Sequence, residues 1–135
     1  MAPEGTARFR RSQRLHRPAE FQAAYAAGRR FGNEMFIATV RIPEGSDGAR
    51  LGLSIAARTV GNAVCRNRVR RQVRESFRLA QAGLPPVDIV IGARPAARAA
   101  KTSELRSALQ RLWTEINEAW AQRSSKASSA SISGA

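Results

Sequence analysis

The sequence predicts one small α+β domain, and three observations lead to that prediction. The chain has 135 residues, which by the usual size of domains suffices for one modest core but not for two. Three segments space their apolar residues as amphipathic helices do. Three other segments are apolar, β-branched runs typical of strands. Helices and strands are therefore expected to share one core.

The first ordered element is expected to be a short helix. Residues 1–14 are basic and polar and are predicted to form a flexible arm, so the domain is expected to span residues 15–121. Pro18 suits a helix start, and Phe21 and Tyr25 lie one turn apart on one face. Gly28 then ends a helix over residues 18–27.

Two strands are predicted next, over residues 34–42 and 49–56. Turn-forming Pro, Gly and Asp lie between them, so we expect a hairpin. A third strand is predicted over residues 87–93, a nearly continuous apolar run typical of an interior strand with both faces covered.

The last element is expected to be a helix that begins at Thr102 or Ser103, either of which can serve as an N-cap. Its apolar residues recur at spacings of three and four up to Trp120, and Trp113 and Trp120 are expected to pack in the core. Residues 122–135 are mainly serine and alanine, which predicts a disordered tail.

The segment between the second and third predicted strands is the most basic in the chain. It holds six arginines between Arg66 and Arg78, with Glu75 as the single acid. A helix over residues 63–80 would place an apolar stripe on one side, made of Cys65, Val69, Val73, Ser76 and Ala80. Polar residues take the opposite side, namely Asn67, Arg68, Arg71, Arg74 and Arg78, with Arg66 and Arg70 flanking the stripe.

This concentration of positive charge predicts a nucleic-acid partner. The chain has 23 Lys and Arg against 10 Asp and Glu, a formal net charge of +13. The alternative is a helix face that contacts only solvent, but such faces usually mix charges of both signs. Like charges within two turns repel one another, and a polyanion would relieve that repulsion.

The residues for an independent protein catalyst are scarce. His16 is the only histidine and is expected at the surface or on a phosphate, and Cys65 is expected to be a buried thiol. The acids are scattered, and neither a zinc ligand cluster nor a phosphate-binding loop occurs, so no protein-bound metal or cofactor is predicted. Any catalysis in which this protein takes part is therefore expected to be carried by another molecule.

The lone cysteine also bears on location, because it allows no internal disulfide and favours a reducing, cytoplasmic environment. No apolar run is long enough for a signal peptide or a membrane span, so no membrane partner is expected. Phe21 and Tyr25 leave two interpretations open: they are core residues, or they form a stacking platform for unpaired bases.

Four segments of the chain resemble segments of one known family. VGNAVCRNRVRRQVRESFR, residues 60–78, closely resembles the signature of the bacterial ribonuclease P protein component, an Arg-Asn-Arg helix followed by further basic residues and an aromatic. RLHRPAEFQAAYAAGRR, ARLGLSIAAR and VDIVIGARP resemble the family's first helix and the strands before and after the signature. The resemblance covers residues 14–121 in the family's order.

The resemblance implies an αβββαβα two-layer sandwich with a left-handed βαβ crossover, a fold also found in a ribosomal-protein domain. It implies a short additional strand near Arg29–Gly32. It further implies the function of an RNA-binding subunit of a ribonucleoprotein endonuclease, a hydrolase that removes the 5′ leader of precursor tRNA. The chemistry would belong to the catalytic RNA and its Mg²⁺ ions, and no obligate protein partner is implied.

Site residues follow from the resemblance by position. The residues matched to the signature helix, which faces the catalytic RNA and the tRNA, are Arg66, Asn67, Arg68, Arg70, Arg71 and Arg74. The residues matched to the cleft for the single-stranded leader are Phe21, Tyr25, Ser54 and Arg58. The family commonly has two adjacent basic residues after this strand, whereas this chain has Ala57 and Arg58. Two outcomes are compatible with this departure: leader affinity through that pair is weaker, or Arg29 or Arg30 supplies the missing charge.

Two other functions are compatible with the charge. A ribosomal-protein-like structural RNA binder without a processing role would share the basic helix, although it would have no use for a leader cleft. A DNA-binding module is disfavoured, because no helix-turn-helix spacing precedes the basic helix.

Overall fold

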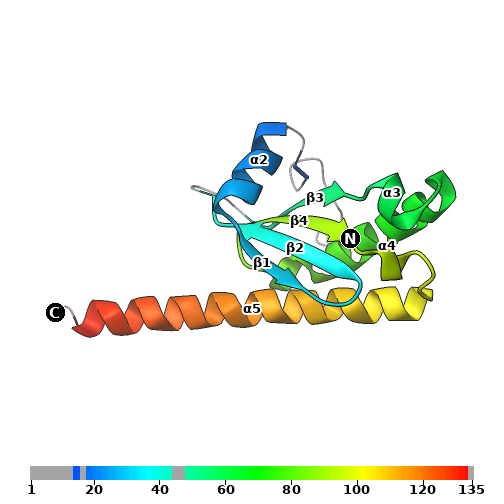
Figure 1. Cartoon of the computed structure of the whole chain (residues 1–135). Coiled ribbons are helices and arrows are strands. Elements are labelled where there is room, and N and C mark those ends of the chain that lie inside the picture. The colour runs from blue at the N-terminus through cyan, green and yellow to red at the C-terminus, as the bar shows by residue number, and fades with distance from the viewer. Residues whose placement is uncertain (1–13, 16–17, 44–47, 134–135) are drawn as a thin grey trace, which may run out of the picture.

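The computed structural model describes residues 14–15, 18–43 and 48–133, without the side chains of residues 124–133. One four-stranded sheet lies between α2 on one side and the long α5 on the other (Figure 1). The elements in chain order are α2 (Pro18–Ala27), β1 (Arg29–Gly32), β2 (Phe36–Arg41), β3 (Arg50–Ser54), α3 (Ala57–Val60), α4 (Ala63–Ala80), β4 (Asp88–Ala93) and α5 (Thr102–Ser133). Apart from the single turn α3, this is the predicted αβββαβα order, and β1 is the short additional strand that the resemblance implied.

The predicted hairpin between the strands over residues 34–42 and 49–56, which are β2 and β3 in the structure, was wrong. The sheet order is β1-β2-β4-β3, so β2 forms its hairpin with β1 and is separated from β3 by β4. β4 is antiparallel to β2 and parallel to β3, and α3 and α4 make the crossover from β3 to β4. The physical reason is burial: β4 is the most apolar strand, and between β2 and β3 it packs against α2 on one face and against the main core on the other.

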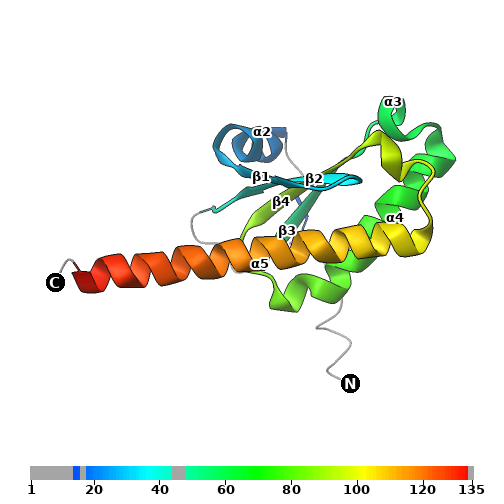
Figure 2. The same ribbon diagram turned by 60° about the horizontal axis from the view of Figure 1, so that its bottom comes forward.

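The main core lies between the sheet and the pair α4 and α5, which both lie on the side away from α2 (Figure 2). Phe36, Leu51, Ile89 and Ile91 of the sheet contribute to it, and Trp113 is buried there as predicted. A smaller cluster on the other side joins Phe21 and Ala24 of α2 to Leu15 and Val90, which are buried.

α5 begins at Thr102, as predicted, but it does not end near Gln122. Its backbone continues to Ser133, within residues 122–135 for which a disordered tail was predicted. The sequence between Thr102 and Ser133 contains neither Gly nor Pro, the two residues that most strongly end helices. Alanine and lysine within it are good helix formers, and the serines are tolerated.

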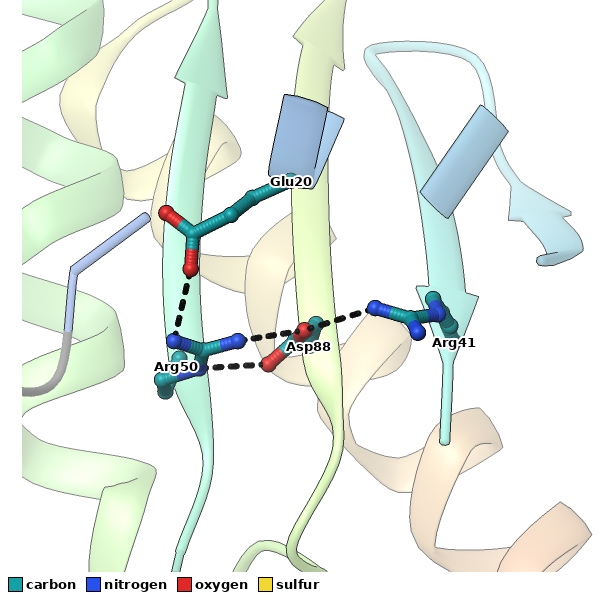
Figure 3. Close-up of polar contacts among 4 residues, drawn as sticks. All are labelled: Glu20, Arg41, Arg50 and Asp88. Atoms are coloured by element: carbon teal, nitrogen blue, oxygen red, sulfur yellow. Dashed lines mark hydrogen bonds and ion pairs between the residues drawn. The ribbon is translucent and has the colours of Figure 1, made fainter. Parts of the chain in front are cut away.

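An ion cluster ties α2 to the sheet (Figure 3). Asp88 of β4 is fully buried and accepts two hydrogen bonds of 2.8 Å from Arg50 of β3, while Arg41 of β2 lies 3.7 Å away. Arg50 also donates to Glu20 of α2 at 2.8 Å. These contacts, with that of Asp88 first, raise the pKa of Arg50. The cluster therefore holds three adjacent strands and α2 in register.

We expect Asp88→Asn to lower the free energy of unfolding by about 2 kcal/mol, because it leaves the guanidinium of Arg50 without its buried counterion. The expected loss in the free energy of unfolding is smaller than for a fully buried ion pair, because the Arg50 side chain is 29% exposed. Urea unfolding measures the change.

Glu34→Gln is the matched control. Its hydrogen bond with Arg111 lowers the pKa of Glu34 to about 2, but both side chains are at least half exposed and the pair contributes little. Equal destabilisation by the two substitutions would contradict the role given to Asp88.

Candidate functional site

The apolar side of the basic helix α4 packs into the main core. This packing fixes the direction in which the opposite, cationic side of the helix faces. Val69, Val73 and Phe77 are fully buried, and the Phe77 ring meets Trp113 of α5 edge-on at 6.0 Å. Trp113 Nε1 also donates to Ser76 Oγ at 2.8 Å. The predicted stripe omitted Phe77, although its position four residues after Val73 on a helix is a signal that it faces the same side. Cys65 is only half-buried.

The start of α4 is set by two residues before it. Asn62 is the N-cap, and its side-chain oxygen accepts a hydrogen bond from the backbone nitrogen of Cys65 at 3.0 Å. Gly61 has a φ of 95°, which glycine adopts without strain, and this lets the chain turn sharply between α3 and α4. The short helix α3, which contains Arg58, was not predicted from the sequence.

The outward side of α4 is cationic, as predicted. Asn67, Arg71 and Arg74 are exposed. They border a hollow of about 400 Å³, which is completed by Arg14, Glu75 and Arg78. Arg14 was assigned to the arm, but it pairs with Leu51 beside β3 and so brings its charge to α4. Four arginines thus surround one hollow with a single acid.

The charges around this hollow repel one another. Partial burial, followed by the charges of Arg14 and Arg70, lowers the pKa of Arg74. Arginine stays protonated despite such a shift, so the repulsion persists in the free protein. Glu75 offsets part of it through its ion pair with Arg78, which also lowers the pKa of Glu75. An anion in the hollow would relieve the rest.

The remaining signature arginines differ in their surroundings. Arg66 and Arg70 flank the buried stripe as predicted, and the Nε atom of each is buried without a hydrogen-bond partner. Arg68 was predicted to face outward, and that was wrong. It is partly buried, and its guanidinium donates to the carbonyl of Ala100, before α5. Arg68 therefore links α4 to α5, which a helical wheel of α4 alone cannot reveal.

The side of the sheet that faces α2 consists of three rows of residues that run across the strands. One row is the ion cluster, in which Arg50, Asp88 and Arg41 are directly paired. The next row is Gly52, Val90, Thr39 and Arg30, and α2 covers most of it. A Cβ on Gly52 would lie only 2.8 Å from the Phe21 ring, so glycine is what allows this ring to lie on β3.

The third row is the most exposed of the three. It is made of Ser54, Gly92, Ile37 and Gly32, which pair in register across all four strands, and we call it the open strip. Ser54 and Gly32 are exposed, and Gly92 and Ile37 are half-buried. Two of the four residues have no side chain, so the strip is shallow and leaves the sheet backbone accessible.

Helix geometry places Tyr25 beside the open strip. Glu20 reaches the ion cluster, so its flank of α2 faces that row. Tyr25 follows five residues later, which rotates it by about 140° to the opposite flank, toward the open strip. Tyr25 is 50% exposed, whereas Phe21 is packed. Of the two interpretations left open, the core suits Phe21, and an accessible ring suits Tyr25.

The structure thus gathers the predicted site residues into two surfaces. Phe21, Tyr25 and Ser54 lie on or beside the open strip, and exposed Arg58 follows in α3, just after β3. Apart from Arg68, the signature residues form the second surface on α4. The sequence did not single out Gly32, Ile37 and Gly92, because a glycine or isoleucine in a strand carries no chemical signal. His16 and residues 1–13 lie outside the described residues.

Among the residues that the structure describes, no three His, Cys, Asp or Glu side chains are grouped so that they could hold a metal ion. No helix within the same residues is long and apolar enough to cross a membrane.

The chain is similar to proteins of known family. The family model described as Ribonuclease P matches residues 9–117. A "Ribonuclease P protein component" from Thioalkalivibrio sulfidiphilus is 38% identical over 109 residues, covering 81% of this chain and 90% of that protein. One from Shouchella clausii is 42% identical over 103 residues, covering 76% and 84%.

Solved structures agree. The Staphylococcus aureus RNase P protein superimposes with a TM-score of 0.72 at 30% identity, covering 77% of this chain and 94% of that one. The Thermotoga maritima RNase P protein gives 0.69 at 30% identity, covering 76% and 96%. With the family model matching most of its length, this chain belongs to the ribonuclease P protein family.

Proposed function

We propose that this chain is the RNA-binding protein subunit of the ribonucleoprotein endonuclease ribonuclease P, and that it assists removal of the 5′ leader from precursor tRNA in the cytoplasm. The observation that supports this most directly is the division of α4. Its apolar side is locked into the core, so Asn67, Arg71 and Arg74 are presented outward on a rigid element.

The two surfaces would contact different stretches of RNA. The α4 surface is suited to the backbone of the catalytic RNA and the adjoining tRNA, because guanidinium groups bind phosphates through several donors at once. The guanidinium groups of Arg66 and Arg70 would point outward from the border of the core. The open strip, with Tyr25 and Arg58 near it, suits an unpaired strand that needs stacking and charge.

The hydrolysis would be carried by the RNA partner and the Mg²⁺ ions that it holds. The residues of this chain bind and position the two RNAs. Arg68 contributes differently from its neighbours, because its contact with Ala100 fixes α4 against the start of α5.

Reconstitution with the cognate RNA tests the proposal. We expect the protein to restore cleavage of precursor tRNA at a low magnesium concentration at which the RNA alone is inactive. Binding should weaken with salt, with log K falling by roughly 0.7 to 0.9 per log unit for each phosphate neutralised. Salt-independent binding would contradict the proposal. Equal affinity for tRNA with and without a leader would favour the alternative function, a structural RNA-binding protein without a processing role.

Tyr25→Ala should weaken binding of the reconstituted enzyme to leader-bearing precursor by about fivefold, because base stacking on an aromatic ring contributes about 1 kcal/mol or more. Binding of tRNA without a leader should not change. Fluorescence titration with the two RNAs measures both affinities. Tyr25 is preferable to Phe21 for this test because its half-exposed ring contributes less to folding.

Tyr25→Phe is the control, since it keeps the ring, and it should bind like the unaltered protein. Equal losses with both RNAs would indicate a general defect and not a stacking contact.

A further inference from the structure

A pocket of about 360 Å³ lies between the sheet and α5, on the side away from α2. Arg29 and Phe31 alternate along β1, and Val40, the β2 partner of Arg29, packs against the main core. All three therefore lie on the α5 side of the sheet, and Arg29 faces away from the open strip. Ile116 and Trp120, one turn apart on α5, form the facing wall.

The pocket is open because α5 continues beyond the sheet (Figure 1). The apolar stripe of α5 extends as far as Trp120, which is half-buried like Ala119 beside it. Ile42, just past the end of β2, also lines the pocket and is 45% exposed. Accessible aliphatic groups gathered in a hollow of this size are typical of a contact site.

Two arginines border the pocket, and we call them the pocket arginines. The guanidinium carbon of Arg29 lies 4.9 Å from the centre of the Phe31 ring, and that of Arg123 lies 5.5 Å from the centre of the Trp120 ring. Cation-π contacts of this kind favour one position of each guanidinium. Both arginines are exposed, so their N–H groups remain accessible to an anion.

Neighbouring carboxylates are directed away from the pocket. Glu34, just after β1, is paired with Arg111 of α5, and Asp88 is engaged in the ion cluster. Glu118 is two residues before Trp120, which places it about 200° around the helix, on the opposite side. Among the described residues, neither pocket arginine forms an ion pair. The mouth of the pocket is therefore positive and accessible to a carboxylate from another molecule.

The chemistry of the pocket fits a peptide better than it fits RNA. Phe31 and Trp120 both pack against the main core and carry a guanidinium, which leaves little ring surface to stack a base. An aliphatic lining also cannot satisfy the polar edges of a base. An apolar side chain with carboxylates beside it matches both the lining and the pocket arginines.

The pocket is separate from the two surfaces proposed to bind RNA. The open strip lies on the other side of the sheet. The contacts of α5 with α4 come earlier in the helix, at Arg106 and Trp113, which bond to Gln72 and Ser76. A molecule in the pocket would therefore leave both RNA surfaces uncovered.

We propose that this pocket docks an acidic segment of a partner protein, which inserts an apolar side chain beside Ile42 and Trp120 and places carboxylates on Arg29 and Arg123. The partner would join the assembled ribonucleoprotein without displacing RNA. This inference goes beyond the proposed function and does not depend on it.

Fluorescence anisotropy of the reconstituted ribonucleoprotein with a short labelled peptide tests the proposal. The probe carries a central leucine flanked by glutamates; a second peptide has serine in place of the leucine, and a third has glutamines in place of the glutamates. We expect only the first to bind measurably, with an affinity that falls as salt is raised. Arg29→Gln and Arg123→Gln should each weaken its binding by about two- to fivefold. Ile42→Ser should weaken it by about fivefold without changing the salt dependence.

Arg30→Gln is the matched control for Arg29→Gln, because it removes the same charge from the same strand on the side that faces α2, and it should not change peptide binding. Arg123→Gln and Ile42→Ser should leave precursor cleavage unchanged, which separates the pocket from the proposed function. If the pocket variants bind the first peptide like the unaltered ribonucleoprotein, or if the three peptides bind alike, the proposal is refuted. It is also refuted if Arg123→Gln weakens assembly with the catalytic RNA as much as Arg71→Gln does, since the pocket would then contact RNA.

Discussion

The double substitution Arg71→Glu with Arg74→Glu is expected to abolish the restoration of precursor-tRNA cleavage at low magnesium, with assembly on the RNA weakened by at least about 100-fold. Both side chains are exposed on α4 and line the hollow, so their reversal changes the surface and not the core. Each reversal replaces an attraction to phosphate with a repulsion, and the two act at the same place. Titration of the labelled catalytic RNA and single-turnover cleavage measure the effect.

The control must change the net charge equally at another surface. Arg29→Glu with Arg123→Glu does so, since these arginines lie over Phe31 and Trp120 at the pocket beside α5, away from the α4 hollow. It should weaken assembly only modestly, through the long-range field. An equal loss in both double variants would mean that total charge, and not the α4 surface, determines binding.

The largest effect on stability is expected from Phe77→Ala, at about 3–5 kcal/mol. Phe77 is fully buried in the main core and packs edge-on against Trp113, so its removal leaves a cavity between α4 and α5. Such a loss is a large part of the 5–15 kcal/mol that stabilises a typical domain. Urea unfolding, followed by tryptophan fluorescence, measures it directly because Trp113 reports on the altered contact.

Leu79→Ala in the same helix provides the comparison. Leu79 is 67% exposed, so its truncation should cost less than about 0.5 kcal/mol. Comparable destabilisation by the two substitutions would contradict the orientation of α4. RNA binding by the Phe77 variant, measured below its unfolding transition, should weaken as well if the rigid placement of the arginines matters.

Most elements were predictable because their signals are local. The bounds of α4 follow from a period of 3.6 in apolar residues and from the Asn62 cap. Both signals lie within one short segment of the sequence. The burial of the strand over residues 87–93 was predictable because its apolar run is nearly continuous, with Asp88 as the one charged residue. The hairpin was mispredicted because a turn-rich loop indicates only that the chain reverses, and the partner of a strand depends on segments more than 30 residues away.

The site was predictable in part for the same reason. Arg71 and Arg74 could be placed outward from the helix period, but Arg68 could not, because its partner Ala100 lies 32 residues away. Phe21 and Tyr25 appear equivalent on a helical wheel, and only the position of α2 on the sheet separates them. Phe21 lies on Gly52, while Tyr25 remains half exposed.

The amino-acid order alone determined the polycationic character, the helix that concentrates it and the resemblance to the ribonuclease P protein, since charge, periodicity and motif spelling need no partner segment to be recognised. Tertiary structure decided which arginines are available and where an unpaired strand could lie. Ser54, Gly92, Ile37 and Gly32 come from four strands, and only the order β1-β2-β4-β3 aligns them into one strip. Strand pairing is non-local, so a surface built across it becomes visible only in the folded chain.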